Sequence, residues 1–276
     1  MSERIFEVNL LVASLVGLAP KAGVFTLLLF TLEVKAEAFD HSHQKWTSVL
    51  SQHQVNGEFR YSALKAEEAK SAESDFRKYL TELKGVSRSV YEGFSRAQKM
   101  AFLINAYNAL TVKLIVDHYP VKSIKDTGTI FTKPWSIKFF DLLDGTIKSL
   151  DPIEHEYLRP KFSDYRIHAA VNCASKSCPE LRKEAFVSEK LDAQLDDQMA
   201  KWLTDPHRNR VDHEGKTIFL SKIFDWYGKD FESTKGGITA ILFKHAPELY
   251  KDAVARGYVI KFLDYDWSLN EPTQGK

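Results

Sequence analysis

The stretch Arg166–Arg182 reads RIHAAVNCASKSCPELR and contains both cysteines of the chain, Cys173 and Cys178. Its first seven residues alternate, with apolar side chains at 167, 169 and 171, which is the period of a strand with one buried face. Pro179 suits the first position of a helix. We therefore expect a strand over 166–172 and a loop that carries the thiols to a helix beginning near Pro179. A helix start lowers the pKa of a thiol, and the thiolate is the nucleophilic form.

A straight strand would not pair His168 with a thiol. His168 and Asn172 share a face but lie about 13 Å apart along a strand, and Cys173 nominally faces the other way. Either the chain turns sharply at Asn172, or Cys178 folds back toward His168, or another histidine serves Cys173. Cysteine is also among the most buried residue types, so structural thiols or a disulfide are the alternative.

Length and composition are those of an ordinary globular protein. The chain has 276 residues, 44% hydrophobic and 27% charged, which is enough for one large domain or two small ones. Its net charge is +1, so a nucleic-acid partner is not expected.

The first 38 residues have the pattern of a leader. Two apolar runs, Leu10–Leu18 and Ala22–Leu32, precede the small-x-small sequence Ala36-Glu37-Ala38. We expect residues 1–38 to be a signal peptide or, if uncleaved, a membrane anchor, with a buried amphipathic helix as the alternative. The mature chain would begin near Phe39, in the periplasm or outside the cell, and would touch a membrane only through an uncleaved leader.

Residues 39–276 are expected to form one helix-rich α+β domain with a small antiparallel sheet. The clearest helix begins at Ser95, which forms a capping box with Gln98, and ends before Pro120. Asn105 and Asn108 share one face of it and either brace neighbouring backbone or line a pocket. The other predicted elements are helices over 39–55, 66–83 and 183–203 and from Ser221, hairpins around Asp144-Gly145 and Glu214-Gly215, and a closing strand over 258–267.

A short helix is also expected where Asp151 precedes Pro152. Glu154 and His155 point in different directions on such a helix, so they are not expected to be partners. Either Glu154 serves the site and His155 faces solvent, or the reverse. A glutamate in the first turn is also simply favourable to the helix dipole.

Four segments, 102–110, 149–159, 168–179 and 265–270, resemble the DUF547 family in their order and their residues: FLINAYNAL, SLDPIEHEYLR, HAAVNCASKSCP and YDWSLN. The resemblance covers roughly Phe59–Asn270. The family is a domain of unknown function, similar at a distance to papain-like and transglutaminase-like folds. Those folds carry their nucleophile at a helix start. Here the long helix has no cysteine and Asn105 stands in that neighbourhood, which implies a rearranged or lost site.

The first functional hypothesis is an exported thiol hydrolase or acyl transferase, which needs a thiolate, a histidine base and a polar group that orients the histidine. We expect Cys173 as nucleophile, because it directly follows the predicted strand while Cys178 packs at a helix start. His168 or His155 is the expected base, and Glu154 or Asn105 the expected orienting group.

Asn105, Asn108 and Asn172 are the expected substrate-binding residues, toward a small molecule or a peptide. The alternative function is a non-catalytic binding or scaffolding domain with a Cys173–Cys178 disulfide. Cys-x4-Cys is not a zinc spacing, so no metal is expected. The chain has no phosphate loop, dinucleotide fingerprint or Gly-x-Ser-x-Gly elbow, so no cofactor and no serine hydrolase are expected.

Overall fold

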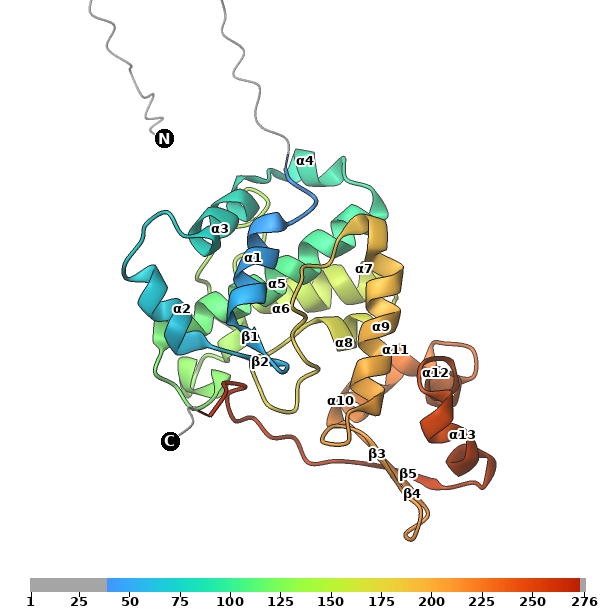
Figure 1. The fold of residues 1–276 in the computed structure, drawn as a ribbon. Helices are drawn as coiled ribbons and strands as arrows, with labels where there is room; N and C mark the ends of the chain where they lie inside the picture. Colours follow the sequence, from blue (N-terminus) through green and yellow to red (C-terminus); the bar gives the residue numbers. More distant parts are fainter. Residues whose placement is uncertain (1–38, 274–276) are drawn as a thin grey trace, which may run out of the picture. The chain divides into compact units, whose positions relative to one another are not determined.

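Helix α5 (Arg96–His118) runs through the middle of the domain in the computed structural model, which describes residues 39–273 (Figure 1). The predicted capping box is confirmed: the Ser95 hydroxyl accepts from the Gln98 amide, and the Gln98 side chain accepts from the Ser95 amide. Nearly every residue from Met100 to Val116 is buried, because other elements cover all sides of the helix. The expected leader over 1–38 lies outside the described residues.

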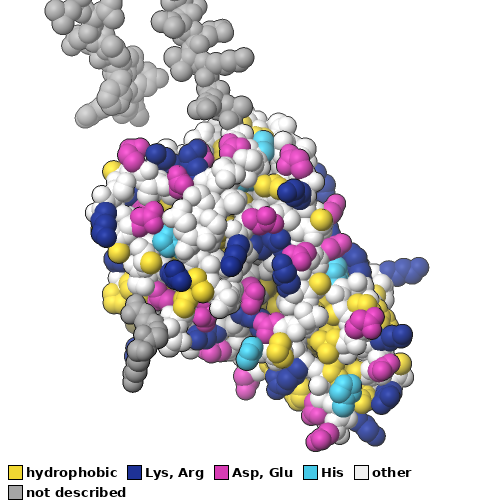
Figure 2. All heavy atoms as spheres, viewed as in Figure 1, with side chains coloured by type: hydrophobic (Ala, Val, Ile, Leu, Met, Phe, Trp, Pro, Cys, Tyr) yellow, Lys and Arg dark blue, Asp and Glu magenta, His cyan; other side chains and the backbone are white. Residues whose placement is uncertain are grey.

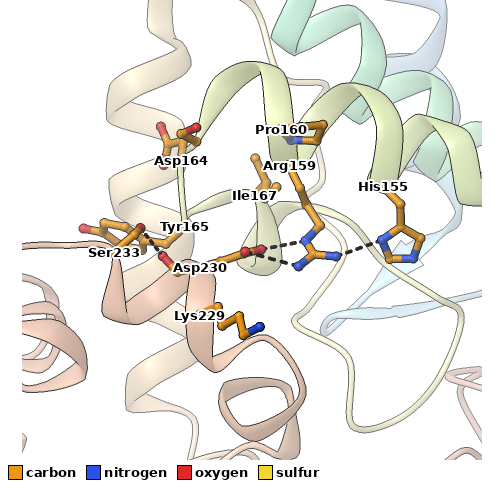
Figure 3. A pocket seen from close by; sticks show the side chains of 10 residues that line it. His155, Arg159, Pro160, Asp164, Tyr165, Ile167, Lys229, Asp230 and Ser233 are labelled. Atoms are coloured by element: carbon orange, nitrogen blue, oxygen red, sulfur yellow. Dashed lines mark hydrogen bonds and ion pairs between the residues drawn. The ribbon is translucent and has the colours of Figure 1, made fainter.

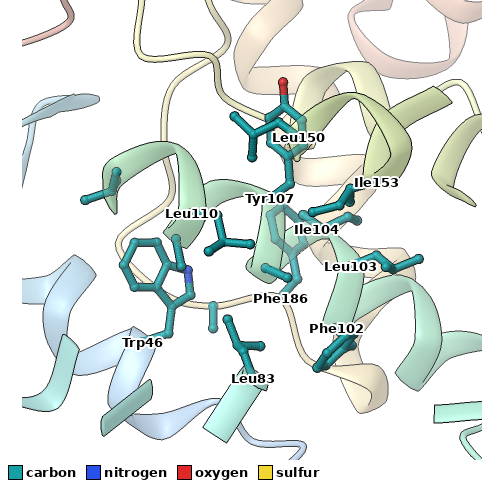
Figure 4. Close-up of a cluster of buried hydrophobic side chains, with 14 of the residues drawn as sticks. Trp46, Leu83, Phe102, Leu103, Ile104, Tyr107, Leu110, Leu150, Ile153 and Phe186 are labelled. Atoms are coloured by element: carbon teal, nitrogen blue, oxygen red, sulfur yellow. The ribbon is translucent and has the colours of Figure 1, made fainter. Parts of the chain in front are cut away.

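Within residues 39–273, α5 is the one helix with the length and hydropathy of a membrane span, and 89% of that window is buried inside the protein. A helix that is apolar all round can equally be the core helix of a large domain. Figure 4 shows Phe102, Leu103, Tyr107 and Leu110 of α5 among side chains from segments before and after the helix, from Trp46 to Phe186.

Short elements before α5 cover one of its sides. They are α1 (Gln44–His53), β1 (Gln54–Val55), β2 (Glu58–Phe59), α2 (Tyr61–Glu68), α3 (Asp75–Gly85) and α4 (Arg88–Glu92). Asn56 and Gly57 both have positive φ and make the predicted turn between β1 and β2. The continuous helix predicted over 66–83 is wrong, because α2 ends at Glu68 and the Ser74 hydroxyl caps α3 as a new start.

The segment after α5 is mostly irregular. It contains η1 (Ile124–Thr127), η2 (Pro134–Ser136), α6 (Leu150–Pro152), the π-helix η3 (Ile153–Leu158), α7 (Arg159–Phe162) and α8 (Ile167–Ala170). The hairpin predicted around Asp144-Gly145 is reduced to a single bridge between Leu142 and Ile147. The short helix predicted near Pro152 is confirmed, although Ser149 and not Asp151 precedes it.

The strand predicted over 166–172 is wrong. Ile167–Ala170 is one turn of helix, and both faces of the expected strand are buried there. Over so short a run of small residues, two-residue alternation does not distinguish a strand from a single helical turn.

The last part of the chain builds a second cluster of buried side chains around α9 (Leu191–Thr204). Besides α9, this part of the chain contains η4 (Ser188–Lys190), β3 (Arg210–Asp212), β4 (Thr217–Leu220), α10 (Lys222–Trp226), α11 (Gly228–Glu232), α12 (Gly237–His245), α13 (Pro247–Ala255) and β5 (Val259–Phe262). The hairpin around Glu214-Gly215 is confirmed as the antiparallel pair β3–β4, and Ser221 caps α10 as predicted. The closing strand is shorter than predicted and pairs parallel to β4, so the sheet is mixed and not antiparallel.

The helix predicted over 183–203 begins only at Leu191, and no helix starts at Pro179. Side chains from elsewhere hold this segment extended: Asn105 bonds both backbone groups of Phe186, and Gln194 bonds the carbonyl of Ala185. The architecture is nevertheless the predicted one, a helix-rich α+β domain with 54% helix and small sheets. Acidic and basic side chains are interspersed on the face shown in Figure 2.

Candidate functional site

The two cysteines lie on a tight loop that follows α8. Val171 is extended, Ala174 adopts a left-handed conformation with φ of 60°, and the Asn172 carboxamide accepts from the Ala174 amide at 2.8 Å. These features bend the chain so that the Cys173 amide donates to Cys178 Sγ at 3.0 Å. Of the arrangements left open by the sequence, the sharp turn at Asn172 is the one observed, and it brings the Cys178 sulfur to the Cys173 amide.

Buried asparagines hold this loop in place. Asn108 accepts from the Asn172 amide at 2.8 Å and donates to the Ala170 carbonyl at 2.9 Å. Asn172 also donates to the Pro179 carbonyl and accepts from the side chain of Asn270. Asn105, Asn108 and Asn172 are all buried, and their side chains bond backbone groups and, in Asn172, also the side chain of Asn270. This is the bracing option left open for the asparagines of α5.

The closing segment of the chain lies along the other side of the thiol loop. The Lys176 amide donates to the Ser268 carbonyl at 2.9 Å, and the Asn270 amide donates to the Ala174 carbonyl at 3.1 Å. This pairing brings the Tyr265 hydroxyl to 3.2 Å from both sulfur atoms. Residues almost a hundred positions apart thus form one polar cluster.

The thiols are both free and differ in their surroundings. Burial alone would raise the pKa of Cys178, but hydrogen bonds from Cys173, Ser175 and Tyr265 outweigh it and lower the pKa to about 6. The hydrogen bond to Cys178, burial and the nearby negative charge raise the pKa of Cys173 well above its usual value. The donors that converge on Cys178 Sγ favour its ionised form. Cys178 is buried, while Cys173 is half-buried.

His168 is oriented by a carboxylate from the second half of the domain. Its Nε2 lies 2.8 Å from Asp230 Oδ2, and its ring packs against Tyr227 with centroids 4.2 Å apart. Arg159 donates two hydrogen bonds to the same carboxylate, from Nε at 2.6 Å and from Nη2 at 3.1 Å. The hydrogen bond from His168 and the contact with Arg159 hold the pKa of Asp230 far below its usual value, although burial opposes this. The carboxylate is therefore ionised, and its bond orients the imidazole so that Nδ1 is left for another partner.

Figure 3 shows Arg159 between Asp230 and His155. His155 is partly exposed and lines a wide, open hollow of about 400 Å³ on this side of the ion pair. Its Nδ1 lies 3.0 Å from Arg159 Nη1 and 4.0 Å from the Glu154 carboxylate. Among the options left by the sequence, Glu154 is thus the buried residue and His155 faces the open hollow.

A small aromatic cavity brings the other predicted residues together. Its volume is about 70 Å³, and it is lined by Tyr107, Trp135, Glu154, His168, Val171, Cys173, Cys178, Ile223, Trp226, Tyr227, Tyr265 and Trp267. We call it the thiol pocket. Each of the four segments quoted from the sequence contributes to it: Tyr107, Glu154, the histidine with both thiols, and the closing aromatics. Burial and the charge of the nearby Glu154 raise the pKa of Tyr227, so that hydroxyl stays protonated at the pocket wall.

Cys173, Cys178, His168 and Glu154 meet at the thiol pocket, whereas His155, Asn105, Asn108 and Asn172 do not line it. Sequence reasoning missed Asp230, Arg159, Ser175 and Tyr265 as parts of the site. Tyr265 and Arg159 lie in segments already quoted for their resemblance, so that signal could have found them. Asp230 carries no local signal, because only the packing of α11 against α8 brings it to His168. Among residues 39–273, no cluster of three or more His, Cys, Asp or Glu side chains is arranged to hold a metal ion.

Residues 91–203 match the family described as "Protein of unknown function, DUF547", and this part of the chain is a DUF547 domain. The match spans the segments that supply Tyr107, Glu154, His168 and both thiols, and it ends before Asp230 and Tyr265. No curated protein and no solved structure matches the chain.

Proposed function

We propose that this DUF547 protein is a thiol-dependent hydrolase or acyl transferase whose reaction takes place in the thiol pocket. The observation that carries the proposal is the convergence of a stabilised thiolate, Cys178, and a carboxylate-oriented histidine, His168, on one cavity. A thiolate, a histidine and a group that orients the histidine are the parts that covalent acyl transfer requires.

The reaction would start from the Cys178 thiolate. Its sulfur attacks a carbonyl carbon held in the pocket, and a tetrahedral oxyanion forms. When this collapses, the bond to the leaving group breaks, and the leaving group takes a proton from His168. A thioester on Cys178 remains. His168 then removes a proton from water or from an acceptor hydroxyl or amine, which attacks the thioester and releases Cys178.

Asp230 and Arg159 support this cycle without touching the substrate. The ionised Asp230 keeps the His168 ring in one orientation through the 2.8 Å contact with Nε2. Arg159 donates a hydrogen bond to each carboxylate oxygen of Asp230, and these two bonds hold the carboxylate in its position beside His168. Asp230 takes the orienting role that the sequence left between Glu154 and Asn105.

The choice between the thiols rests on hydrogen bonding. The sequence favoured Cys173 because it was expected to follow a strand, but that strand is absent. Donors converge on Cys178, while Cys173 serves as one of them. Cys173 is more accessible than Cys178, so Cys173 is the alternative nucleophile.

The cavity restricts the substrate. At about 70 Å³ it holds only a few atoms beyond water size, so a narrow acyl or amide group would enter while the rest of the molecule stays outside. Its walls are mostly aromatic, which favours an apolar or flat group. The expected leader supports an exported location for this activity.

Turnover of a panel of p-nitrophenyl esters and aminocoumarin amides tests the proposal. We expect Cys178→Ser and His168→Ala each to reduce turnover by about 10²-fold or more, the usual contribution of a nucleophile or an acid–base group. Tyr258→Phe, which removes a hydroxyl on the exposed β3–β4 side, is the matched control and should retain activity. Equal turnover by all of these chains would refute the proposal.

A binding module with a Cys173–Cys178 disulfide is the second candidate. It is favoured by the closeness of the two residues: the Cys173 amide donates to Cys178 Sγ at 3.0 Å, and the Tyr265 hydroxyl lies 3.2 Å from both sulfurs. A disulfide would remove the thiolate and leave the aromatic pocket for binding alone.

A further inference from the structure

The turn at Thr129–Thr132 displays the two most exposed large apolar side chains among the described residues. Ile130 and Phe131 are each 91% exposed, whereas Val259, the next, is 60% exposed. Single exposed apolar residues are ordinary, but two adjacent side chains with almost no protein contact at a protruding turn are not.

The turn is built in a way that keeps these side chains out. The Thr129 amide donates to the Thr132 carbonyl at 2.9 Å, and the Thr129 hydroxyl accepts from the amides of Phe131 and Thr132. Gly128 lies at its base, where a Cβ atom would come within 2.6 Å of the Thr132 carbonyl oxygen. Local hydrogen bonds therefore satisfy the backbone, and the apolar pair is presented by an ordered turn.

Exposed basic side chains flank the apolar tip in the sequence. Lys122, Lys125, Lys133 and Lys138 are all exposed, and no carboxylate of residues 39–273 lies within 4.0 Å of their Nζ atoms. The acidic residue inside the segment, Asp126, spends its carboxylate on the amides of Lys122 and Ser123. The segment 122–138 is thus positive around an apolar centre.

The base of this segment reaches the rim of the thiol pocket. Lys125 Nζ lies 4.0 Å from the centre of the Trp267 ring, and Trp135 packs edge-on against Trp267 at 5.6 Å. Trp226, which is 46% exposed, stacks on the other side of Trp267 at 5.7 Å. Partly exposed tryptophans favour the boundary between water and lipid.

From these observations we propose that the segment 122–138 docks on an anionic membrane surface, with Ile130 and Phe131 inserted among the lipid headgroups. Apolar side chains at the tip gain free energy by leaving water, and the unpaired lysines neutralise lipid phosphates. The proposal is independent of the leader and of the chemistry in the thiol pocket. A protein that binds the same apolar tip is the competing explanation. Binding of such a protein would not depend on the charge of a lipid surface.

Flotation of the full chain with vesicles tests the proposal. One vesicle preparation contains phosphatidylcholine alone, and the other contains phosphatidylcholine with phosphatidylglycerol. We expect binding to the anionic vesicles that weakens as salt is raised. The double variant Ile130→Ser with Phe131→Ser should bind them at least about tenfold more weakly, as expected from the apolar area withdrawn from lipid. Lys133→Glu should reduce binding about fivefold or more and flatten the salt dependence.

The matched control removes two other exposed apolar side chains, with Val90→Ser and Val259→Ser. Val90 lies in α4, before the N-terminal end of α5, whereas the docking segment follows the C-terminal end of that helix. This control should bind like the unmodified chain. All these side chains are exposed, so circular dichroism melts should coincide. Equal binding of the loop variant and the control would overturn the proposal.

A second readout separates the loop from any contribution of residues 1–38. A fluorophore sensitive to polarity is attached at Ile130→Cys in a chain whose Cys173 and Cys178 are replaced by serine, so that only the introduced thiol can react. Its emission should shift to the blue on anionic vesicles, and the same label at Ser89→Cys in α4 should not shift. An unchanged spectrum at position 130 on chains that float would show that another part of the protein binds, and it would refute docking by this loop.

Discussion

Replacing Tyr265 with phenylalanine should raise the pKa of Cys178 and slow its alkylation. The substitution removes one hydroxyl and leaves the ring, which packs against Trp226 and Trp267 with centroids 4.8 Å and 4.5 Å away. The lost contacts are those of the hydroxyl with Cys178 Sγ and Cys173 Sγ, each at 3.2 Å, and the hydrogen bond that it accepts from Ser175 Oγ at 2.9 Å. The change therefore removes one donor to the thiolate with little loss of packing.

A hydrogen bond to a charged group contributes about 1.5–3 kcal/mol. Since one pKa unit corresponds to about 1.4 kcal/mol, the pKa of Cys178 should rise by about 1–2 units from its value of about 6. At about pH 6.5, the thiolate fraction would then fall from about three quarters to about a quarter or less. The alkylation rate at that pH should fall in the same proportion, and the two proteins should converge above about pH 9.

The assay is iodoacetamide alkylation between about pH 5 and 9, with each cysteine followed separately by peptide mass spectrometry. The unmodified chain should show a Cys178 midpoint near pH 6, and Tyr258→Phe should not move it. A Cys178 midpoint near the ordinary thiol value of about 8.5 in the unmodified chain would refute the reasoning. Faster alkylation of Cys173 than of Cys178 would restore the sequence-based choice of nucleophile.

Other expected outcomes concern the supporting residues. Asn105→Leu should lower the free energy of unfolding by about 2–5 kcal/mol in urea melts, because both backbone groups of Phe186 lose their partner, and a loss under about 1 kcal/mol would contradict this. The depressed pKa of Asp230 stabilises the fold above about pH 4, the unfolded value, and this stabilisation is lost as the pH falls. Asp230→Asn should therefore flatten the fall in melting temperature between about pH 5 and 2, and a parallel curve would count against the ion pair. Oxidised glutathione should join Cys173 to Cys178 by a disulfide and release two equivalents of reduced glutathione. The disulfide should block alkylation of both thiols until dithiothreitol is added. Unchanged alkylation after this treatment would show that the two thiols do not form a disulfide.

The sequence predicts those parts of this fold that depend on local patterns. Helix α5 has a capping box, helical periodicity and a stop at proline within one segment, and the Glu214-Gly215 turn specifies its hairpin with neighbouring residues. Segments held by distant partners are different. Residues 179–187 read as the start of a helix, yet buried amides from α5 and α9 hold them extended.

The candidate site shows the same division. His168 and the two cysteines lie within eleven residues, so the sequence singled them out. The positions of these three side chains relative to one another depend on the single helical turn α8 and on a bend set by Asn172 and Ala174. The alternation of small residues in this segment predicted a strand instead. Asp230 reaches His168 only because α11 packs beside α8. Tertiary packing alone decides such a pairing.

The central claim is that Cys178 forms a covalent acyl intermediate that His168 helps to resolve. The most direct measurement is to mix the protein with p-nitrophenyl acetate, quench the reaction at successive times and analyse the protein by mass spectrometry. We expect an acetyl group on Cys178 that hydroxylamine removes, that decays quickly in the unmodified chain, and that persists in His168→Ala. No acetyl group on Cys178, or equal decay in the two proteins, would contradict it.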